Sequence, residues 1–359
     1  MPTPAPRDTH CRPLTEPPMP QPKTVLIVTD AWHPQINGVV RSIELVIKEM
    51  EKRGITVKLL TPNEFKTFPM PGYGEIRLSR TLMKPVYARI EAAAPDAIHI
   101  ATEGPLGIMA RRWCRKRRFE FSTAYHTQFP EYLRARLPVP LRWSYRFLRW
   151  FHGAAKYCLV GTPHLKTLLE QRGFTNAVIW QKGVDTQLFS PTRREPLAYD
   201  GPVFLYVGRV AVEKNIEAFV SLELPGTKLV VGGGPSLDKL RAEYPDVVFV
   251  GPKQGEELAR LFASADVFVF PSKTDTFGLV LLEALASGTP VAAFPVTGPI
   301  DVIGDAPVGV LDHDLRAAAL KALHVSRDEC RTYAEQFSWA ASTDQFLHYL
   351  PVKGDSRSS

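Results

Sequence analysis

Short apolar runs alternate along most of the chain with longer segments in which apolar positions recur at helical spacing. The run TVLIVTD (24–30) lacks polar alternation, which indicates a strand covered on both faces, and residues 38–53 have the spacing of a helix. Repetition of this pair of patterns predicts an α/β fold with largely parallel sheets. The expected strands are 24–30, 56–60, 96–100, 121–126 and 157–162, and then 203–209, 228–234, 247–251, 267–272 and 291–296.

The alternation stops once, at residues 185–201, which are rich in charge and proline and have little periodicity. We interpret this segment as a linker between two domains, 23–184 and 202–335. Residues 329–350 have a last helical pattern whose aromatic residues suit packing across a domain boundary, and we expect 336–350 to cross back to the first domain. Two Rossmann-like, doubly wound domains facing a central cleft would bind ligands at the carboxyl ends of their strands.

Composition limits the setting in which the protein works. Residues 1–22 contain eight prolines and no apolar signal-peptide core, so we expect this segment to be disordered. No window reaches the roughly 18–20 uninterrupted apolar residues of a spanning helix. The four cysteines are too scattered for a zinc site or a disulfide framework, which favours a reducing, cytoplasmic location. They are Cys11, Cys114, Cys158 and Cys330.

Positive charge is concentrated in one region. Eleven Lys or Arg and two Glu lie between Arg111 and Arg149, a local excess of 11 − 2 = +9 that exceeds the formal net charge of +7. Within it, residues 132–153 mix arginine with aromatic residues, as do peripheral membrane helices on anionic lipid. Nucleic acid is a competing partner, but no nucleic-acid motif accompanies the charge, and a solvated, dimerising or core-packed helix is a further alternative. The residues expected at the membrane or acceptor are Arg142, Trp143, Arg146, Arg149 and Trp150.

Two features of the first domain are candidates for chemistry. Asn37 and Gly38 lie between a strand and a helix, where free backbone N–H groups suit a phosphate, although a plain turn explains them equally well. His126 ends the strand FSTAYH and is a candidate for a hydrogen bond to a sugar hydroxyl or a reacting oxygen. A structural histidine is its alternative interpretation.

In the second domain, two loops follow strands at the same expected sheet edge. Arg209 and Lys214 in GRVAVEKN are spaced to neutralise a diphosphate, whereas such a pair standing alone is more often only solvated. The glycines of GGGPS (232–236) allow a backbone to approach a ligand closely.

The segment FVFPSKTDTFGLVLLEALASGTPVAAFPV (268–296) holds two carboxylates around an apolar helix. Glu283 has apolar neighbours on all sides, and an unpaired charge there costs several kcal/mol. It therefore requires a partner, either ligand hydroxyls or a buried salt bridge. Asp275 lies at the start of the helix, where a capping role is its alternative.

A D-x-D triplet in LDHDL (311–315) precedes a helix late in the chain, so helix capping is favoured over a metal site. We predict no catalytic metal and no other cofactor, because Arg209, Lys214 and helix ends supply positive charge.

Together these residues resemble the retaining GT-B glycosyltransferases of family 4, which include mannosyltransferases and bacterial glycolipid synthases. The likeness spans residues 23–350. Its most specific part is 268–296, which is similar to the family's E-x7-E signature, with Asp275 in place of the first glutamate. GVDTQLFSP (183–191) and GRVAVEKN (208–215) are also similar to family motifs.

The resemblance implies a nucleotide-diphosphate-sugar donor bound mainly in the second domain. It implies that Arg209 and Lys214 hold the diphosphate and Glu283 the ribose hydroxyls. It implies that Asp275, Thr276, Phe277 and Gly278 contact the donor sugar, and that His126 contacts this sugar near its reacting carbon. It also implies that the base lies near Gly251 and that Gly38 contacts the phosphates.

The acceptor is left open by the resemblance, and the basic-aromatic residues suggest a lipid. We expect a hexosyltransferase that uses a UDP-sugar to glycosylate a lipid such as diacylglycerol, associated peripherally with the inner face of the plasma membrane. Within the class, the alternative is a GDP-mannose-dependent mannosyltransferase acting on a phosphoinositide or soluble sugar. Outside it, the alternatives are a nucleotide-sugar epimerase and a non-enzymatic binding module.

Overall fold

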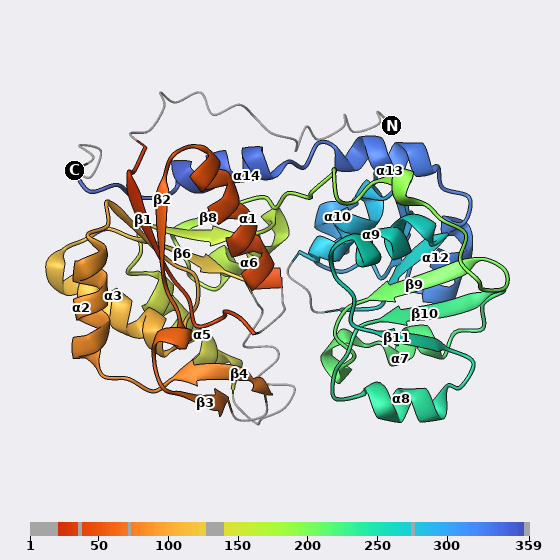
Figure 1. Cartoon of the computed structure of the whole chain (residues 1–359), viewed down its shortest axis with the longest axis horizontal. Coiled ribbons are helices and arrows are strands. Elements are labelled where there is room, and N and C mark those ends of the chain that lie inside the picture. Colours follow the sequence, from red (N-terminus) through yellow and green to blue (C-terminus); the bar gives the residue numbers. More distant parts are fainter. Residues whose placement is uncertain (1–20, 35–37, 71–72, 127–139, 274–276, 355–359) are drawn as a thin grey trace.

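The computed structural model describes residues 21–34, 38–70, 73–126, 140–273 and 277–354. It consists of two lobes, each built on a six-stranded sheet with helices on its faces (Figure 1). The expected α/β class with parallel sheets is confirmed. Of residues 1–22, which the sequence predicts to be disordered, 1–20 lie outside the described residues.

The first sheet has the order β2-β1-β5-β6-β7-β8 and is parallel throughout. Its strands are β1 (Thr24–Val28), β2 (Thr56–Leu60), β5 (Ala97–Ile100), β6 (Ser122–Tyr125), β7 (Tyr157–Val160) and β8 (Ala177–Ile179). The lobe's helices are α1 (Gly38–Lys52), α2 (Met83–Ala93), α3 (Pro105–Arg117), α5 (Leu141–His152) and α6 (Pro163–Gln171), with a short 3₁₀ turn at Pro62–Glu64. An antiparallel pair, β3 (Thr67–Met70) and β4 (Tyr73–Ser79), lies outside this sheet.

The second sheet has the order β11-β10-β9-β12-β13-β14 and is also parallel. Its strands are β9 (Val203–Val207), β10 (Thr227–Val231), β11 (Val248–Gly251), β12 (Val267–Phe270), β13 (Val291–Ala293) and β14 (Gly309–Leu311). The helices are α7 (Glu217–Val220), α8 (Leu237–Glu243), α9 (Gly255–Ser264), α10 (Leu279–Ala286), α11 (Pro299–Val302), α12 (Leu315–Ala322), α13 (Arg327–Ala334) and α14 (Trp339–His348). 3₁₀ turns occupy Pro191–Arg193 and Val212–Lys214.

Strand order reverses direction once in each sheet. The chain runs from β1 outward to β2 and then returns to β5 on the other side of β1; in the second sheet it runs from β9 to β10 and β11 and then returns to β12. Ligands of such sheets bind at this reversal, outside the carboxyl ends of the strands. The loops after β1, β9 and β12 are therefore those best placed for chemistry.

The strands are shorter than the apolar runs that predict them. β1 ends at Val28 because the next two side chains bond outside the sheet. Thr29 donates its hydroxyl to the carbonyl of Ala31, and the buried Asp30 carboxylate accepts the backbone N–H groups of Leu106 and Gly107 at the start of α3. Hydropathy alone does not reveal such endings, because Thr and Asp can continue a strand pattern at its edge.

The end of the chain differs from the single helical pattern over 329–350. It forms two helices, α13 and α14, separated by residues 335–338, and the Ser338 side chain accepts the N–H of Ala341 to begin α14. α14 packs on α1 of the first lobe, as Figure 1 shows (blue, beside the red α1). Residues 185–201, expected as a linker, carry Phe189, which is buried against Phe262 of the second lobe.

Candidate active site

Two loops of the second lobe pack directly on each other at the carboxyl edge of its sheet. The N–H of Val210 donates to the carbonyl of Gly233 at 2.9 Å, and that of Gly208 donates to Val231 at 3.0 Å. A Cβ on Gly232 would lie 1.8 Å from the Gly208 carbonyl oxygen. A glycine at position 232 therefore allows this loop-to-loop contact.

Arg209 and Lys214 both lie in the loop that follows β9, next to the point where the strand order reverses. The Arg209 guanidinium lies 3.4 Å from the Glu213 carboxylate and is partly exposed. Lys214 ends the 3₁₀ turn Val212–Lys214. The adjacent Asn215 donates its side-chain amide to the carbonyl of Pro271 at 3.0 Å, which ties this loop to the one after β12. The loop that carries Arg209 and Lys214 thus packs beside Pro271, just after the end of β12.

The start of α10 is built by a glycine and an aromatic residue. Gly278 has φ = +81°, a conformation that residues with a side chain rarely adopt. Phe277 is buried and contacts the first lobe, since a Cβ on Gly161 would lie 3.6 Å from its side chain. Asp275 and Thr276 lie outside the described residues.

The N-termini of two helices meet at this position. A Cβ on Gly38, the first residue of α1, would lie 3.8 Å from the side chain of Leu279, the first residue of α10. Each end carries the positive pole of a helix dipole. With Arg209 and Lys214 on the neighbouring loop, this region of the cleft is suited to an anion. Gly251 ends β11 with φ = +74°, further along the same sheet edge.

Glu283 is 4% exposed and pairs across the lobes with Arg41 of α1, whose Nη1 lies 2.8 Å from Oε1 of the glutamate. Burial raises the pKa of Glu283, and Arg41 opposes that rise. The buried salt bridge weighed as an alternative is therefore present. It uses one carboxylate oxygen only, since Oε2 has no hydrogen-bond partner among the described residues. A cavity of about 190 Å³ borders this pair, lined also by Phe189, Leu279 and Trp339.

His126 follows β6, and its imidazole lies 5.9 Å from the Trp180 ring, centroid to centroid. Burial lowers the pKa of His126 well below 6.5, and Lys182 lowers it further. A neutral imidazole can both donate and accept a hydrogen bond.

Lys182, which sequence reasoning overlooked, lies over the face of the same Trp180 ring, with Nζ 3.0 Å from the ring centroid. Its signal in the sequence was faint, a single lysine in AVIWQKGV. A desolvated cation–π contact contributes about 2 kcal/mol. Because burying an unpaired ammonium costs several kcal/mol, burial lowers the pKa of Lys182 well below its usual range.

α5 carries an exposed basic-aromatic face. Trp143 is 55% and Trp150 43% exposed, with Phe147 between them, and Arg142, Arg146 and Arg149 are exposed on the same helix. The opposite face is buried through Tyr145, Leu148 and Phe151. Arg111 of α3 stacks 3.9 Å from the Trp150 ring centroid and donates to the carbonyls of Trp150 and Phe151. The helix is thus core-packed on one side only. Residues 127–139, part of the predicted basic stretch, lie outside the described residues.

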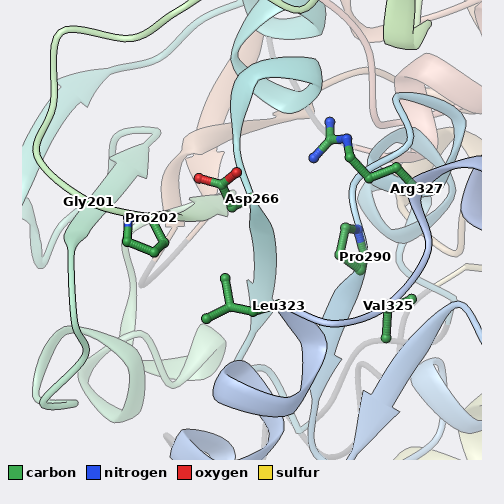
Figure 2. A pocket seen from close by; sticks show the side chains of 7 residues that line it. All are labelled: Gly201, Pro202, Asp266, Pro290, Leu323, Val325 and Arg327. Carbon is green, nitrogen blue, oxygen red and sulfur yellow. The ribbon is translucent and has the colours of Figure 1, made fainter.

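A larger cavity of about 330 Å³ opens at the opposite, amino-terminal edge of the second sheet (Figure 2). Its charged groups are engaged within the protein: Asp266 accepts the N–H of Val203 at 2.8 Å, and Arg327 donates to the carbonyls of Ala263 and Ala265. With its polar groups satisfied and far from the strands' carboxyl ends, this cavity is not a candidate for catalysis.

Among the described residues, no group of three His, Cys, Asp or Glu side chains is arranged to hold a metal ion. The carboxylate of Asp314 in LDHDL accepts the N–H groups of Arg316 and Ala317 and caps α12, which confirms the capping interpretation. No helix of the described part of the chain is long and apolar enough to cross a bilayer.

Comparison with known families agrees with this geometry. Residues 36–188 match the model "Glycosyltransferase Family 4", and residues 191–335 match "Glycosyl transferases group 1". A GDP-mannose-dependent alpha-mannosyltransferase of Mycobacterium tuberculosis (strain CDC 1551 / Oshkosh) is 30% identical over 92% of this chain and 97% of its own length. The chain is a GT-B glycosyltransferase of the GT4 group. This GT4 enzyme is a hexosyltransferase with a nucleotide-sugar donor.

Two further similarities of this GT4 enzyme are informative. An alpha-monoglucosyldiacylglycerol synthase of Streptococcus pneumoniae (strain ATCC BAA-255 / R6) is 28% identical, over 84% of this chain and 78% of the relative. The solved sucrose-phosphate synthase of Thermosynechococcus elongatus superposes with a TM-score of 0.71 at 22% identity, covering 91% of this chain and 98% of that structure. The second similarity supports the fold alone.

Proposed function

We propose that this GT4 enzyme transfers a hexosyl group from a nucleotide-diphosphate sugar to a lipid acceptor at an anionic membrane surface. The observation that carries the proposal is the basic-aromatic face of α5, on which Trp143, Phe147 and Trp150 are exposed among arginines. Exposed tryptophans cost free energy in water and gain it in a lipid interface. Each arginine near an anionic surface adds about 1 kcal/mol.

The surface extends beyond α5. Leu82 and Met83 are exposed at the start of α2, and Arg112 of α3 contacts the Met83 sulfur at 3.9 Å. Arg111, the neighbouring residue, holds α5. We therefore infer a peripheral site formed by the beginning of α2, the basic end of α3 and α5, facing the inner leaflet of the plasma membrane.

For the donor, we assign the diphosphate to Arg209 and Lys214 together with the N-termini of α1, at Gly38, and of α10. Glu283 would accept hydroxyls of the ribose through its Oε2 atom, with Arg41 retaining Oε1. Asp275, Thr276, Phe277 and Gly278 would contact the transferred sugar, and the base would lie near Gly251. His126 would contact the sugar near its reacting carbon.

The proposed chemistry proceeds with retention at the anomeric carbon. The acceptor hydroxyl attacks on the face from which the diphosphate leaves, and the leaving phosphate takes the hydroxyl proton. Stabilisation of the departing negative charge is the protein's main contribution, and Arg209, Lys214 and the helix ends deliver it without a metal ion. Closure of the lobes would exclude water from the reaction.

Two relatives support different parts of the proposal. The M. tuberculosis relative, matched over nearly its full length, is named for GDP-mannose, which favours GDP-mannose here. The alpha-monoglucosyldiacylglycerol synthase supports a lipid acceptor and names no nucleotide, so a UDP-sugar is the second donor to test. Incubation with GDP-mannose and a set of UDP-hexoses, each with extracted lipids, decides between them when the products are identified by mass. The proposal predicts a hexosylated lipid with one donor class; transfer to soluble sugars alone would contradict the lipid acceptor.

Binding to vesicles tests the surface separately from catalysis. We expect the enzyme to sediment with phosphatidylglycerol vesicles at low salt and to be released as salt rises, since exposed charges are screened. The double substitution Trp143→Ser, Trp150→Ser should reduce binding at least tenfold. Ile300→Ser, which alters an equally exposed apolar residue of the second lobe, is the matched control and should leave binding unchanged. Equal binding by the double variant would refute the assignment of α5.

A further inference from the structure

Lys182 is a buried cationic side chain for which the proposed donor site has no use. It is 7% exposed, and its Nζ has no hydrogen-bond partner among the residues that the structure describes. The Trp180 face contacts Nζ but accepts no conventional hydrogen bond. Most buried polar side-chain atoms in proteins are hydrogen-bonded, so an unpartnered ammonium or amine at this position calls for an explanation.

The backbone around Lys182 is fixed. The indole N–H of Trp180 donates to Ser342 of α14, and the N–H of Gln181 donates to the side chain of Gln345 at 2.9 Å. On the other side of Lys182, the N–H of Val184 donates to the carbonyl of Phe337 at 2.9 Å. The lysine is therefore held from both directions at the carboxyl end of the first sheet. A surface lysine folded inward by chance would not be anchored in this way.

Two histidines lie against the same indole as Lys182. His126 and His99 share the Trp180 ring with it, at 5.9 Å and 6.4 Å between ring centroids. His99 is bonded to Ser122 through Nδ1, and burial together with Lys182 lowers its pKa to about 3, so it is neutral and brings no negative charge. His126 is partly exposed, whereas His99 is 1% exposed.

We propose that Lys182 binds an anionic oxygen group of the substrate, a phosphate, sulfonate or carboxylate, next to the sugar that His126 contacts. The inference rests on the proposed function and narrows its substrate class. Because Lys182 belongs to the first lobe while Arg209 and Lys214 serve the diphosphate from the second, the anion belongs on the acceptor side. An acidic lipid headgroup then fits the site better than neutral diacylglycerol. An acidic group on the donor sugar is the other source of the same chemistry.

The flexible lysine arm suits this role. Four rotatable bonds let Nζ leave the Trp180 face and meet an anion that has reached His126. A bound anion would also supply the charge that favours the protonated ammonium. Lys182 is a specificity residue in this account, since it touches a substituent of the substrate and not the bonds that form and break.

The test compares wild type with Lys182→Met, whose unbranched side chain is one atom shorter and uncharged, and with Lys182→Arg. The first readout needs no turnover: tryptophan fluorescence is followed during titration with sn-glycerol 3-phosphate and, as control, with glycerol. We expect a saturable change in fluorescence with sn-glycerol 3-phosphate and none with glycerol. The apparent affinity for sn-glycerol 3-phosphate should be at least tenfold weaker in Lys182→Met and partly kept in Lys182→Arg. Trp180→Phe, which removes the adjacent indole, should remove the signal.

The second readout is steady-state kinetics with the donor and lipid found to be active. In Lys182→Met, KM for the acidic substrate should rise at least tenfold, with kcat within threefold of wild type. A higher KM for the acceptor would place the anionic group on the lipid, and a higher KM for the donor would place it on the donor sugar. Thermal unfolding verifies that Lys182→Met is folded. If Lys182→Met does not fold, the comparison is made between wild type and Lys182→Arg.

The outcomes separate the two proposals. Unchanged phosphate titration and unchanged KM values in Lys182→Met would overturn this inference while leaving the transferase function standing. Failure to find any transfer, with a Lys182-dependent titration retained, would reject the proposed function and leave an anion site at Lys182.

Discussion

The surroundings of Glu283 show how one residue links the two lobes. Its carboxylate is surrounded by apolar side chains of its own helix, and Arg41 approaches from the first lobe at 2.8 Å. The sequence predicts that Glu283 needs a partner, because no polar face is available on α10. It does not identify Arg41, since 242 positions separate the two residues (283 − 41) and their meeting depends on how the lobes pack.

Removing Arg41 should make the free energy of unfolding fall more steeply as the pH rises from 5 to 7.5. Since burial raises the pKa of Glu283, its ionisation weakens folding as pH rises above about 4.5, the usual value for Glu. Arg41→Met should therefore destabilise the protein by about 1–3 kcal/mol at pH 7.5 and by much less at pH 5. Urea unfolding at both pH values measures this. Adding Glu283→Gln should cancel the pH dependence; a loss equal at both pH values would mean that Arg41 acts through packing alone.

His152 should give the free energy of unfolding a second pH dependence, in this case through a basic side chain. It is buried between Thr123 and Glu103, at 2.9 and 3.0 Å. Burial alone lowers its pKa, but Cys158 and Glu103 outweigh burial and raise it to about 10. The stabilisation that protonated His152 contributes is complete below about pH 6.5 and is lost as the pH rises through about 10. The free energy of unfolding should fall over this interval more steeply in wild type than in His152→Gln. Parallel curves for the two proteins would disprove the assignment.

Among the elements, the crossing between lobes depends on one glycine. A Cβ on Gly183 would lie 2.5 Å from the backbone nitrogen of Trp339, where the two crossing segments touch. Gly183→Ala should cost about 1–3 kcal/mol, because backbone on both sides must shift. Gly233→Ala is the matched control, since its Cβ would have ordinary contact at 3.8 Å from Pro252. Chemical denaturation of both variants measures the difference, and similar midpoints would show that the crossing can adjust.

Strands with long apolar runs could be predicted from the sequence, and short or polar ones could not. β2 has the predicted bounds, 56–60, and β12 begins where expected. β8 and β14, with three residues each, lie in short runs that end at Gln181 and Asp312, whereas the equally short β13 lies in the longer run VAAFPV. The β3–β4 pair contains Pro69. Helices α13 and α14 merged into one pattern because the break at residues 335–338 has no proline or glycine.

At the scale of the candidate site, loop positions followed from the sequence and partners did not. Arg209, Lys214 and Gly278 could be placed at strand ends from the alternation alone. The Gly232 contact with Gly208, the Arg41–Glu283 pair and the burial of Lys182 arise from tertiary packing, which local patterns do not encode.

For the whole molecule, charge on the donor diphosphate should control turnover. Arg209→Ala should lower kcat about a hundredfold, as does loss of one donor to developing negative charge in other enzymes. Arg260→Ala, which removes an exposed arginine paired with Glu195 in the same lobe, is the control and should leave kcat unchanged. Steady-state assays with matched thermal unfolding separate catalysis from folding. Full activity in Arg209→Ala would remove this residue from the site.

The central claim is transfer of a hexosyl group from a nucleotide-diphosphate sugar to a lipid. It is tested most directly by measuring nucleoside diphosphate release and lipid hexosylation together, with and without acceptor vesicles. We predict that the two products form in equal amounts and that release nearly stops when the vesicles are omitted. Release at the same rate without acceptor, or conversion of the donor into another nucleotide sugar without release, would contradict the account.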